Sequence, residues 1–206
     1  MIRALLLAAG ASRRFGAAKL VQPVKGKALI RWSAEALTAA KVSDIVVVVP
    51  PEHEAIRAAL DGLDVRWIVN VDHESGIGAS IAAGVRGLMQ PTHAALIALG
   101  DEPYVEPEVV RRVMDEYRAG AGRVPIVVPA YRGVRGHPVV FDHTVFAELT
   151  TLSGDRGARD VIDRDPTRVR VIEMHRDRPV DVDTPETLRL LEKNAHFTAS
   201  PKPPES

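Results

Sequence analysis

The 206-residue sequence predicts a single α/β domain whose central sheet is mostly parallel. Short runs rich in Val, Ile and Leu alternate with segments whose apolar residues recur at helical spacing, which is the pattern of repeated β-α-β units. The run at 44–50 is apolar along its centre, as expected of a central strand covered on both faces. The chain is long enough to bury a continuous core, and it shows no internal repeat or linker. We expect one domain over residues 1–194 and a disordered Pro- and Ser-rich tail at 195–206.

The individual elements follow from this alternation. Strands are expected where short apolar runs occur, at 4–9, 44–50, 65–70, 93–101, 125–131, 136–141 and 169–175. Helices are expected where apolar residues follow a 3.6-residue period, at 29–40, 51–60, 78–89, 106–120, 156–164 and 184–193. The last helix is expected to begin with Thr184 as its N-cap and Pro185 in its first turn.

Composition argues against several classes of protein. Lys and Arg together number 27, as do Asp and Glu, so no net positive field exists to hold nucleic acid. The absence of cysteine excludes disulfides, thiolate zinc sites and cysteine nucleophiles. The N-terminal apolar run is too short to span a bilayer and lacks a signal-peptide cleavage region. We therefore expect a cytoplasmic protein that binds neither nucleic acid nor membrane.

The turn after the first strand, "LAAGASRRFGAAK", is the first candidate binding site, because α/β sheets bind ligands at the carboxyl ends of their strands. Its spacing matches neither G-x-G-x-x-G nor G-x-x-x-x-G-K-[ST]. Small residues at Ala8, Ala9 and Gly10 let a ligand approach the backbone, where free N–H groups can bind anionic oxygens. Arg14 offers a planar fork to phosphate and Lys19 a point charge. A surface turn with solvated cations is the alternative.

The same stretch fits the pattern L-A-A-G-x-S-x-R-x-G-x-x-K at eight positions. It resembles the loop of nucleotidyltransferases with a glycosyltransferase-A-like fold, which transfer a nucleoside monophosphate from an NTP. The resemblance implies a three-layer α/β/α, Rossmann-like nucleotidyltransferase fold with a mostly parallel mixed sheet. It also implies nucleotide binding by Leu7, Ala8, Ala9, Gly10, Arg14 and Lys19, of which Arg14 and Lys19 are catalytic.

A second motif, "SGIGASIAAGV" at 75–85, is similar to the G-x-G-x-S-[IL]-x-x-G-V segment of the MobA-like molybdenum cofactor nucleotidyltransferases. By this resemblance Gly78 and Ser80 bind the nucleotide. The alternative is a glycine turn followed by a helix cap.

A third motif, "GDEP" at 100–103, is similar to the G-D-Q-P of that family, with Glu102 in place of Gln. The resemblance implies that Asp101 is catalytic, contacts the nucleotide and binds metal. Mg²⁺ is the expected cofactor, with Mn²⁺ as the alternative, because carboxylates and substrate phosphates commonly hold this ion. A turn residue at the end of a strand is the alternative role for Asp101.

The acidic segment "PVDVDTPETL" at 179–188 is similar to the D-[IV]-D-T-P-E-D element that closes the family's site. Asp181 and Asp183 lie two residues apart, so a strand would place both side chains on one face. The resemblance implies Asp183 as the second metal ligand and Asp181 as the fallback. A pair of acids that stabilises the start of a helix is the alternative.

Two remaining segments concern the acceptor. "RGHPVVF" at 135–141 and "LSGDRGARDVI" at 152–162 resemble G-H-P-V-x-F and L-x-G-D-x-G-A-R of the molybdenum cofactor cytidylyltransferases, where they face the pterin. The resemblance implies acceptor binding by His137, Asp155, Arg156 and Arg159. The alternatives are a histidine in a turn and an ion pair between Asp155 and Arg159.

The expected activity is Mg-dependent transfer of CMP from CTP to the terminal phosphate of molybdopterin or molybdenum cofactor, with release of pyrophosphate. Ala9 favours CTP, since guanylyl-transferring relatives read L-A-G-G, although one methyl group discriminates by only ~1–3 kcal/mol. Three alternatives stay open: guanylyl transfer to the same cofactor, nucleotidyl transfer to another phosphorylated acceptor, and a non-catalytic cofactor carrier. A recipient molybdoenzyme or its chaperone is an expected further partner.

Overall fold

The computed structural model describes residues 1–10, 15, 19–120 and 123–193. Arg14 and the predicted tail at 195–206 lie outside the described residues. The main sheet has eight strands, which are β1 (Ile2–Leu7), β4 (Ile45–Val49), β5 (Arg66–Val69), β6 (Ala94–Leu99), β7 (Ile126–Tyr131), β8 (Val134–Arg135), β9 (Val139–Asp142) and β10 (Val169–Glu173). A separate two-stranded sheet pairs β2 (Pro23–Val24) with β3 (Lys27–Ala28).

The helices of the described chain are α1 (Leu29–Ala39), α2 (Glu54–Ala59), α3 (Ile77–Arg86), α4 (Pro107–Gly120), α5 (Phe146–Leu149), α6 (Arg159–Arg164) and α7 (Pro185–Lys193). Single 3-10 turns occur at η1 (Lys19–Val21), η2 (His73–Ser75), η3 (His143–Val145) and η4 (Pro166–Arg168). Among these residues no helix combines the length and the apolar character needed to cross a bilayer.

The main sheet runs in the order β10-β7-β9-β6-β1-β4-β5, with β8 paired to β7. Strands β6, β1, β4 and β5 are mutually parallel, and β10 is parallel to β7. Strand β9 is antiparallel to both β6 and β7. The prediction of a mostly parallel mixed sheet is therefore confirmed, and the loops that follow β1 and β6 leave the sheet at one edge.

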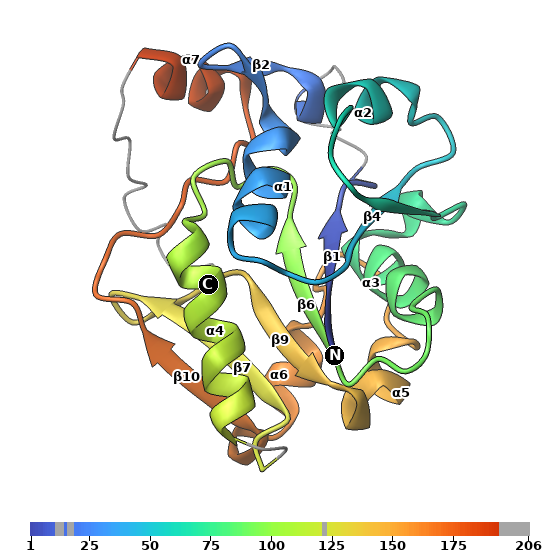
Figure 1. Ribbon diagram of the computed structural model, residues 1–206, viewed down its shortest axis with the longest axis vertical. Coiled ribbons are helices and arrows are strands. Elements are labelled where there is room, and N and C mark those ends of the chain that lie inside the picture. Colours follow the sequence, from blue (N-terminus) through green and yellow to red (C-terminus); the bar gives the residue numbers. More distant parts are fainter. Residues whose placement is uncertain (11–14, 16–18, 121–122, 194–206) are drawn as a thin grey trace.

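Helices cover both faces of the sheet, which confirms the three-layer prediction. Figure 1 shows α1 and α4 across one face, with α6 behind the sheet. Side chains alternate along β1, so Leu6 packs into the core that includes α1 and α4, whereas Leu5 packs into the core that includes α3 and α6. Two hydrophobic cores, one on each face, hold the strand ends in place.

Most predicted elements occur within a few residues of their expected bounds. Thr184 caps α7 as predicted, because its Oγ1 accepts a hydrogen bond from the Thr187 N–H at 3.2 Å. Four short elements, β2, β3, β8 and α5, were not predicted from the sequence, because elements of two to four residues carry no readable periodicity. The turn between β2 and β3 has Lys25 and Gly26 at positive φ, 52° and 74°, as two-residue hairpin turns require.

Leu6 tests the packing of the first core. Its side chain is fully buried, so Leu6→Ala should lower the free energy of unfolding by about 2–5 kcal/mol through lost contacts and a cavity. Leu190→Ala, on α7 where Leu190 is 41% exposed, is the control and should change it by less than about 0.5 kcal/mol. Equal effects in chemical denaturation would contradict this assignment of the core.

Candidate active site

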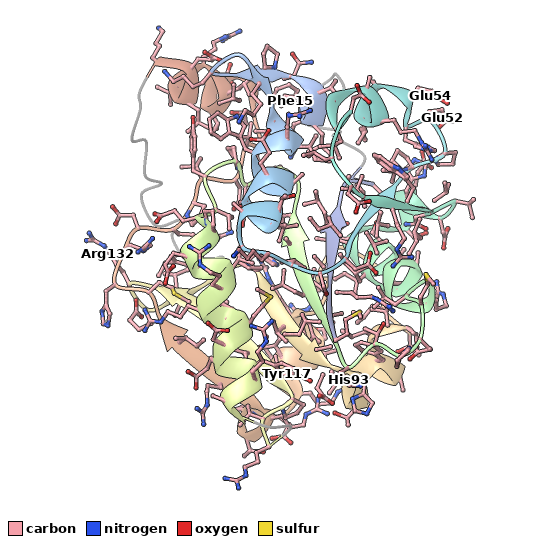
Figure 2. The ribbon with its side chains drawn as sticks, viewed as in Figure 1. Phe15, Glu52, Glu54, His93, Tyr117 and Arg132 are labelled. Carbon is pink, nitrogen blue, oxygen red and sulfur yellow. The ribbon has the colours of Figure 1, made fainter. Side chains whose placement is uncertain are left out.

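Two adjoining cavities lie at the carboxyl ends of β1 and β6. The larger one, about 650 Å³, extends toward Gly10, Phe15 and η2, and the smaller one, about 410 Å³, extends toward His137 and α6. Figure 2 shows Phe15 at the upper end of the molecule, opposite His93 and Tyr117 at the lower end. The cavities share a group of wall residues where they meet: Leu7, Ile77, Leu99, Asp101, Asp155 and Asp183.

Lys19 and two carboxylates meet at this junction. The Lys19 Nζ lies 2.6 Å from Asp101 Oδ2 and 3.7 Å from Asp183 Oδ1. The side chain of Lys19 is 12% exposed, against 25% for Asp101 and 39% for Asp183. The ammonium is therefore largely removed from water, and two opposite charges offset the cost of its burial. Three residues that the sequence analysis selected from distant segments form one charged group.

The loop after β1 contributes backbone and small side chains to the larger cavity. Leu7, Ala9 and Gly10 line it, as predicted for a nucleotide site. Ala8 is different: its side chain is buried, and its N–H donates to the Val48 carbonyl at 2.8 Å. That N–H continues the β1–β4 ladder, so the expectation that it is free for an anion is wrong.

The glycines before α3 make a backbone contact with the 153–155 loop. The Gly78 N–H donates to the Gly154 carbonyl at 2.9 Å, and a Cβ on Gly78 would lie 2.6 Å from the Ser153 carbonyl oxygen. A Cβ on Gly76 would lie 2.4 Å from the Gly154 carbonyl carbon. The missing side chains at these two glycines thus let two loops touch. Gly76 lines the larger cavity, whereas Gly78 is buried behind it.

Ser80, the other residue that the second motif suggests, does line the larger cavity. Its side chain is 3% exposed, and its Oγ accepts a hydrogen bond from Asn70 Nδ2 at 3.2 Å. Asn70 is itself buried at the end of β5. Asn70, His73 and Glu74 were not predicted from the sequence, because they lie between the end of β5 and the second motif, where no pattern marks them.

The predicted acceptor residues line the smaller cavity. His137, Asp155, Arg156 and Arg159 all reach it from the segments before β9 and at the start of α6. Two exposed ion pairs lie in this region, one between Arg156 Nε and Asp160 Oδ1 at 2.5 Å and one between Arg135 Nη1 and Asp163 Oδ1 at 2.7 Å. The alternative pairing of Asp155 with Arg159 is not among the contacts of the described residues.

A second charged cluster, which sequence analysis did not predict, lies against the smaller cavity. Glu102 is fully buried, and its Oε1 lies 3.2 Å from Arg178 Nη2 and 3.5 Å from His137 Nδ1. Arg178 Nη2 also donates to Asp181 Oδ2 at 2.8 Å. Arg178 had no motif to mark it, although its position three residues before Asp181 is a spacing at which a turn brings charges together.

The environment separates the pKa values of the two acids in this cluster. Burial opposes ionisation of Glu102, but His137, Asp181 and Arg178 outweigh it and lower its pKa to about 2. Burial, followed by the charge of Glu102, raises the pKa of Asp181 to about 8. Glu102 is thus the ionised member of the pair at neutral pH, and Asp181 holds the proton.

The two aspartates of the 179–188 segment therefore have different surroundings. Residues 178–184 form no strand, so the expectation that Asp181 and Asp183 share a strand face is wrong. Asp183 reaches Lys19 beside Asp101, whereas Asp181 turns to Arg178. Between them Val182 is fully buried, and its N–H donates to the Asp101 carbonyl at 3.1 Å. This contact fixes the segment against the end of β6.

The donor set at the junction fits a hard divalent cation. Within the described residues no group of three or more His, Asp and Glu side chains could hold a metal. Asp101 and Asp183 nevertheless converge on a single cation, the Lys19 ammonium, and both are partly exposed to the cavities. Two carboxylates completed by substrate phosphates match the way Mg²⁺ is usually held.

A charged cavity at the carboxyl ends of the strands is the usual ligand-binding site of an open α/β sheet. Comparison with known proteins makes this specific: residues 4–170 match the family described as MobA-like NTP transferase domain. The chain belongs to this family, and the resemblance that its motifs indicated is confirmed.

Two curated relatives match nearly the whole chain. Nicotine blue oxidoreductase of Paenarthrobacter nicotinovorans is 33% identical over 92% of this chain and 96% of its own length. Purine catabolism protein PucB of Bacillus subtilis is 28% identical over 92% of this chain and 95% of its own. Neither name describes nucleotidyl transfer.

Solved structures agree with the fold. Rv0371c of Mycobacterium tuberculosis is 29% identical, with a TM-score of 0.79 over 94% of this chain and 99% of its own. A structure of the same protein in complex with manganese gives a TM-score of 0.76 at 27% identity, over 94% of this chain and 98% of its own. A nucleotidyl transferase from Methanothermobacter thermautotroptrophicus, with a TM-score of 0.77 at 23% identity over 94% of this chain and 97% of its own, shares the fold.

Substitutions at Gly78 and Gly10 distinguish a glycine that is needed for packing from one that borders the ligand cavity. Gly78→Ala should lower the free energy of unfolding by about 1–3 kcal/mol, because the added Cβ would clash with backbone atoms of Ser153, which can move only if the loop shifts. Gly10→Ala is the matched control: no described atom lies within 4 Å of its Cβ position, so folding stability should be unchanged while nucleotide binding weakens. Wild-type stability in Gly78→Ala, measured by thermal unfolding, would argue against the loop contact.

The raised pKa of Asp181 predicts a pH-dependent stability. The folded protein keeps this proton up to about pH 8, whereas the unfolded chain loses it near pH 4. The group's contribution to the free energy of unfolding therefore falls as pH rises between these values. Asp181→Asn cannot lose a proton, so its stability relative to wild type should rise across this window in urea titrations. A difference that stays constant or falls with pH would contradict the assignment.

Proposed function

We propose that the protein transfers CMP from CTP to the terminal phosphate of a molybdopterin-type cofactor and releases pyrophosphate. The observation that carries this proposal is the Lys19–Asp101–Asp183 group at the junction of two cavities. Membership of the MobA-like NTP transferase family supports nucleotidyl transfer as the class of reaction. The identity of the base and of the acceptor goes beyond that class.

The two cavities suit the two substrates. The larger one, with Lys19, Ser80 and the backbone of Gly10 in its wall, would take the nucleotide. The smaller one, with His137, Arg156 and Arg159, would take a phosphorylated heterocycle, because the guanidinium group of an arginine can donate to two phosphate oxygens at once. The reacting phosphates would then meet at the shared wall. Arg14, which lies outside the described residues, is assigned to the triphosphate on its motif alone.

In the proposed reaction an oxygen of the acceptor phosphate attacks the α-phosphorus of CTP. A new P–O bond forms, the bond between the α-phosphorus and the bridging oxygen breaks, and pyrophosphate leaves with the electron pair. The acceptor phosphate is ionised at neutral pH, so the site needs no strong general base. The contribution of the protein is then positioning and charge neutralisation, and Lys19 is placed to neutralise negative charge on the phosphates.

Asp101 and Asp183 would hold the divalent cation. When bound, Mg²⁺ neutralises negative charge on the substrate phosphates and holds them in place. The manganese complex of Rv0371c supports a divalent cation in a related protein and leaves Mn²⁺ as the alternative.

The base preference rests on Ala9. Its side chain is fully buried in the core that contains β4, and the residue lines the larger cavity. A methyl group here reduces the space next to the base relative to glycine, which favours the smaller pyrimidine. The effect is limited to ~1–3 kcal/mol, so GTP is the alternative donor that the assay has to include.

The test measures pyrophosphate release with Mg²⁺ and molybdenum-loaded molybdopterin, giving CTP or GTP separately. We expect release with CTP, and a loss of roughly 10²–10³-fold in kcat for Asp101→Ala, because an electrostatic group at the reacting phosphates is removed. Asp115→Ala, in an exposed pair with Arg118 on α4, is the control and should keep wild-type activity. Release with GTP would overturn the base assignment. Cofactor binding without release would favour a carrier.

A further inference from the structure

Glu102 is the centre of the second charged cluster. Its side chain is fully buried one residue beyond Asp101, and its backbone carbonyl accepts a hydrogen bond from Ser33 Oγ at 3.0 Å. A buried carboxylate is costly unless cations or hydrogen-bond donors face it. Two such groups approach the same oxygen, since His137 Nδ1 and Arg178 Nη2 both lie near Oε1.

The contact with Glu102 constrains the ring of His137. The Nδ1 atom is buried and forms no hydrogen bond with any described residue, and its 3.5 Å separation from Glu102 Oε1 is slightly longer than a normal hydrogen bond. A carboxylate oxygen can only accept a hydrogen bond. The ring of His137 can therefore hydrogen-bond to Glu102 only if Nδ1 carries a proton.

The backbone of His137 is held from the other side. The Tyr131 hydroxyl donates to the His137 carbonyl at 2.8 Å. The neighbouring Gly136 lies so close to the Tyr131 ring that a Cβ would be 2.8 Å from Cε2. The backbone of His137 is therefore fixed by Tyr131, and its buried Nδ1 faces Glu102.

We propose that Glu102 is a positioning residue that keeps His137 in the Nδ1–H tautomer and presents its Nε2 to the smaller cavity as a hydrogen-bond acceptor. The His137 side chain lines that cavity and is 29% exposed, while Nδ1 is buried. A neutral imidazole with its proton on one nitrogen accepts at the other. The cavity wall therefore favours a ligand that offers a hydrogen-bond donor at this point.

This inference rests on the proposed function and specifies which kind of group on the acceptor molecule the site recognises. A nitrogen heterocycle can meet this acceptor with a ring N–H or an amino group, and a sugar phosphate could do so with a hydroxyl group. Arg135, Arg156 and Arg159 in the same cavity suit the phosphate end of such a molecule. His137 would then accept a hydrogen bond from the body of the acceptor molecule, and the arginines would bind the phosphate that all phosphorylated acceptors share.

The first experiment reads the tautomer without any substrate. Ring ¹⁵N shifts of His137, assigned with the His137→Gln variant and measured at pH 7.5, should show Nδ1–H in the wild-type protein. Glu102→Leu removes the oxygen that accepts from Nδ1–H, while Asp181 can still pair with Arg178, so the Nε2–H form should increase. A doubly protonated ring, an Nε2–H ring in the wild type, or an unchanged tautomer in Glu102→Leu would overturn the proposal.

The second experiment separates acceptor binding from nucleotide binding. Glu102→Leu should raise KM for the pterin acceptor roughly ten-fold, as expected for one hydrogen bond, and change kcat and the Kd for CTP less than two-fold. Repeated in a His137→Gln background, the same substitution should have no further effect on KM. A fall in kcat with unchanged KM would contradict the positioning role.

The control for folding is Glu106→Gln, which neutralises an exposed glutamate paired with Arg176 and should leave KM unchanged. If the wild-type protein releases no pyrophosphate with this acceptor, the proposed function fails, while the ¹⁵N result still decides the role of Glu102. The two failures are thus distinguishable.

Discussion

The parallel pairing of β1 with β6 is the constraint on which the rest of the site depends. The register opposes Leu7 to Leu99, and the Gly100 N–H donates to the Leu7 carbonyl at 3.0 Å, so both strands end at the same edge. The loop after β1 and the segment after β6 must therefore leave the sheet side by side. This places Lys19 against Asp101, although the two residues are 82 positions apart in the chain.

A second consequence is that the charges of the site fall into two groups with different surroundings. The segment at 101–102 and the segment at 181–183 lie against each other through the Val182 N–H and the Asp101 carbonyl. Each segment gives one acid to each group: Asp101 and Asp183 face Lys19 at the cavity junction, while the other two acids face Arg178. Because charges in a low-dielectric interior interact strongly, the pKa values of Glu102 and Asp181 move in opposite directions.

Family membership alone does not fix the chemistry of this chain. Relatives with nearly full-length similarity carry names as different as an oxidoreductase and a purine catabolism protein. Such a range is expected when one fold holds different sites, since function resides in the side chains of the cavity rather than in the fold. In this chain the features that would set the acceptor are the buried Glu102 and the ring of His137 beside it.

The sequence by itself determined the fold class, the order of the long elements and the position of the charged junction. Apolar runs and helical periodicity are local signals, and the motifs at Lys19, Asp101 and Asp183 each lie next to the end of a strand or the start of a helix. Tertiary structure alone decided which side chains touch. The contact of Gly78 with Ser153, the bonded N–H of Ala8 and the convergence of Arg178 on Glu102 each join segments from different strands or helices. No local pattern encodes such pairings, because sheet order and register set them, and these form only when both cores pack.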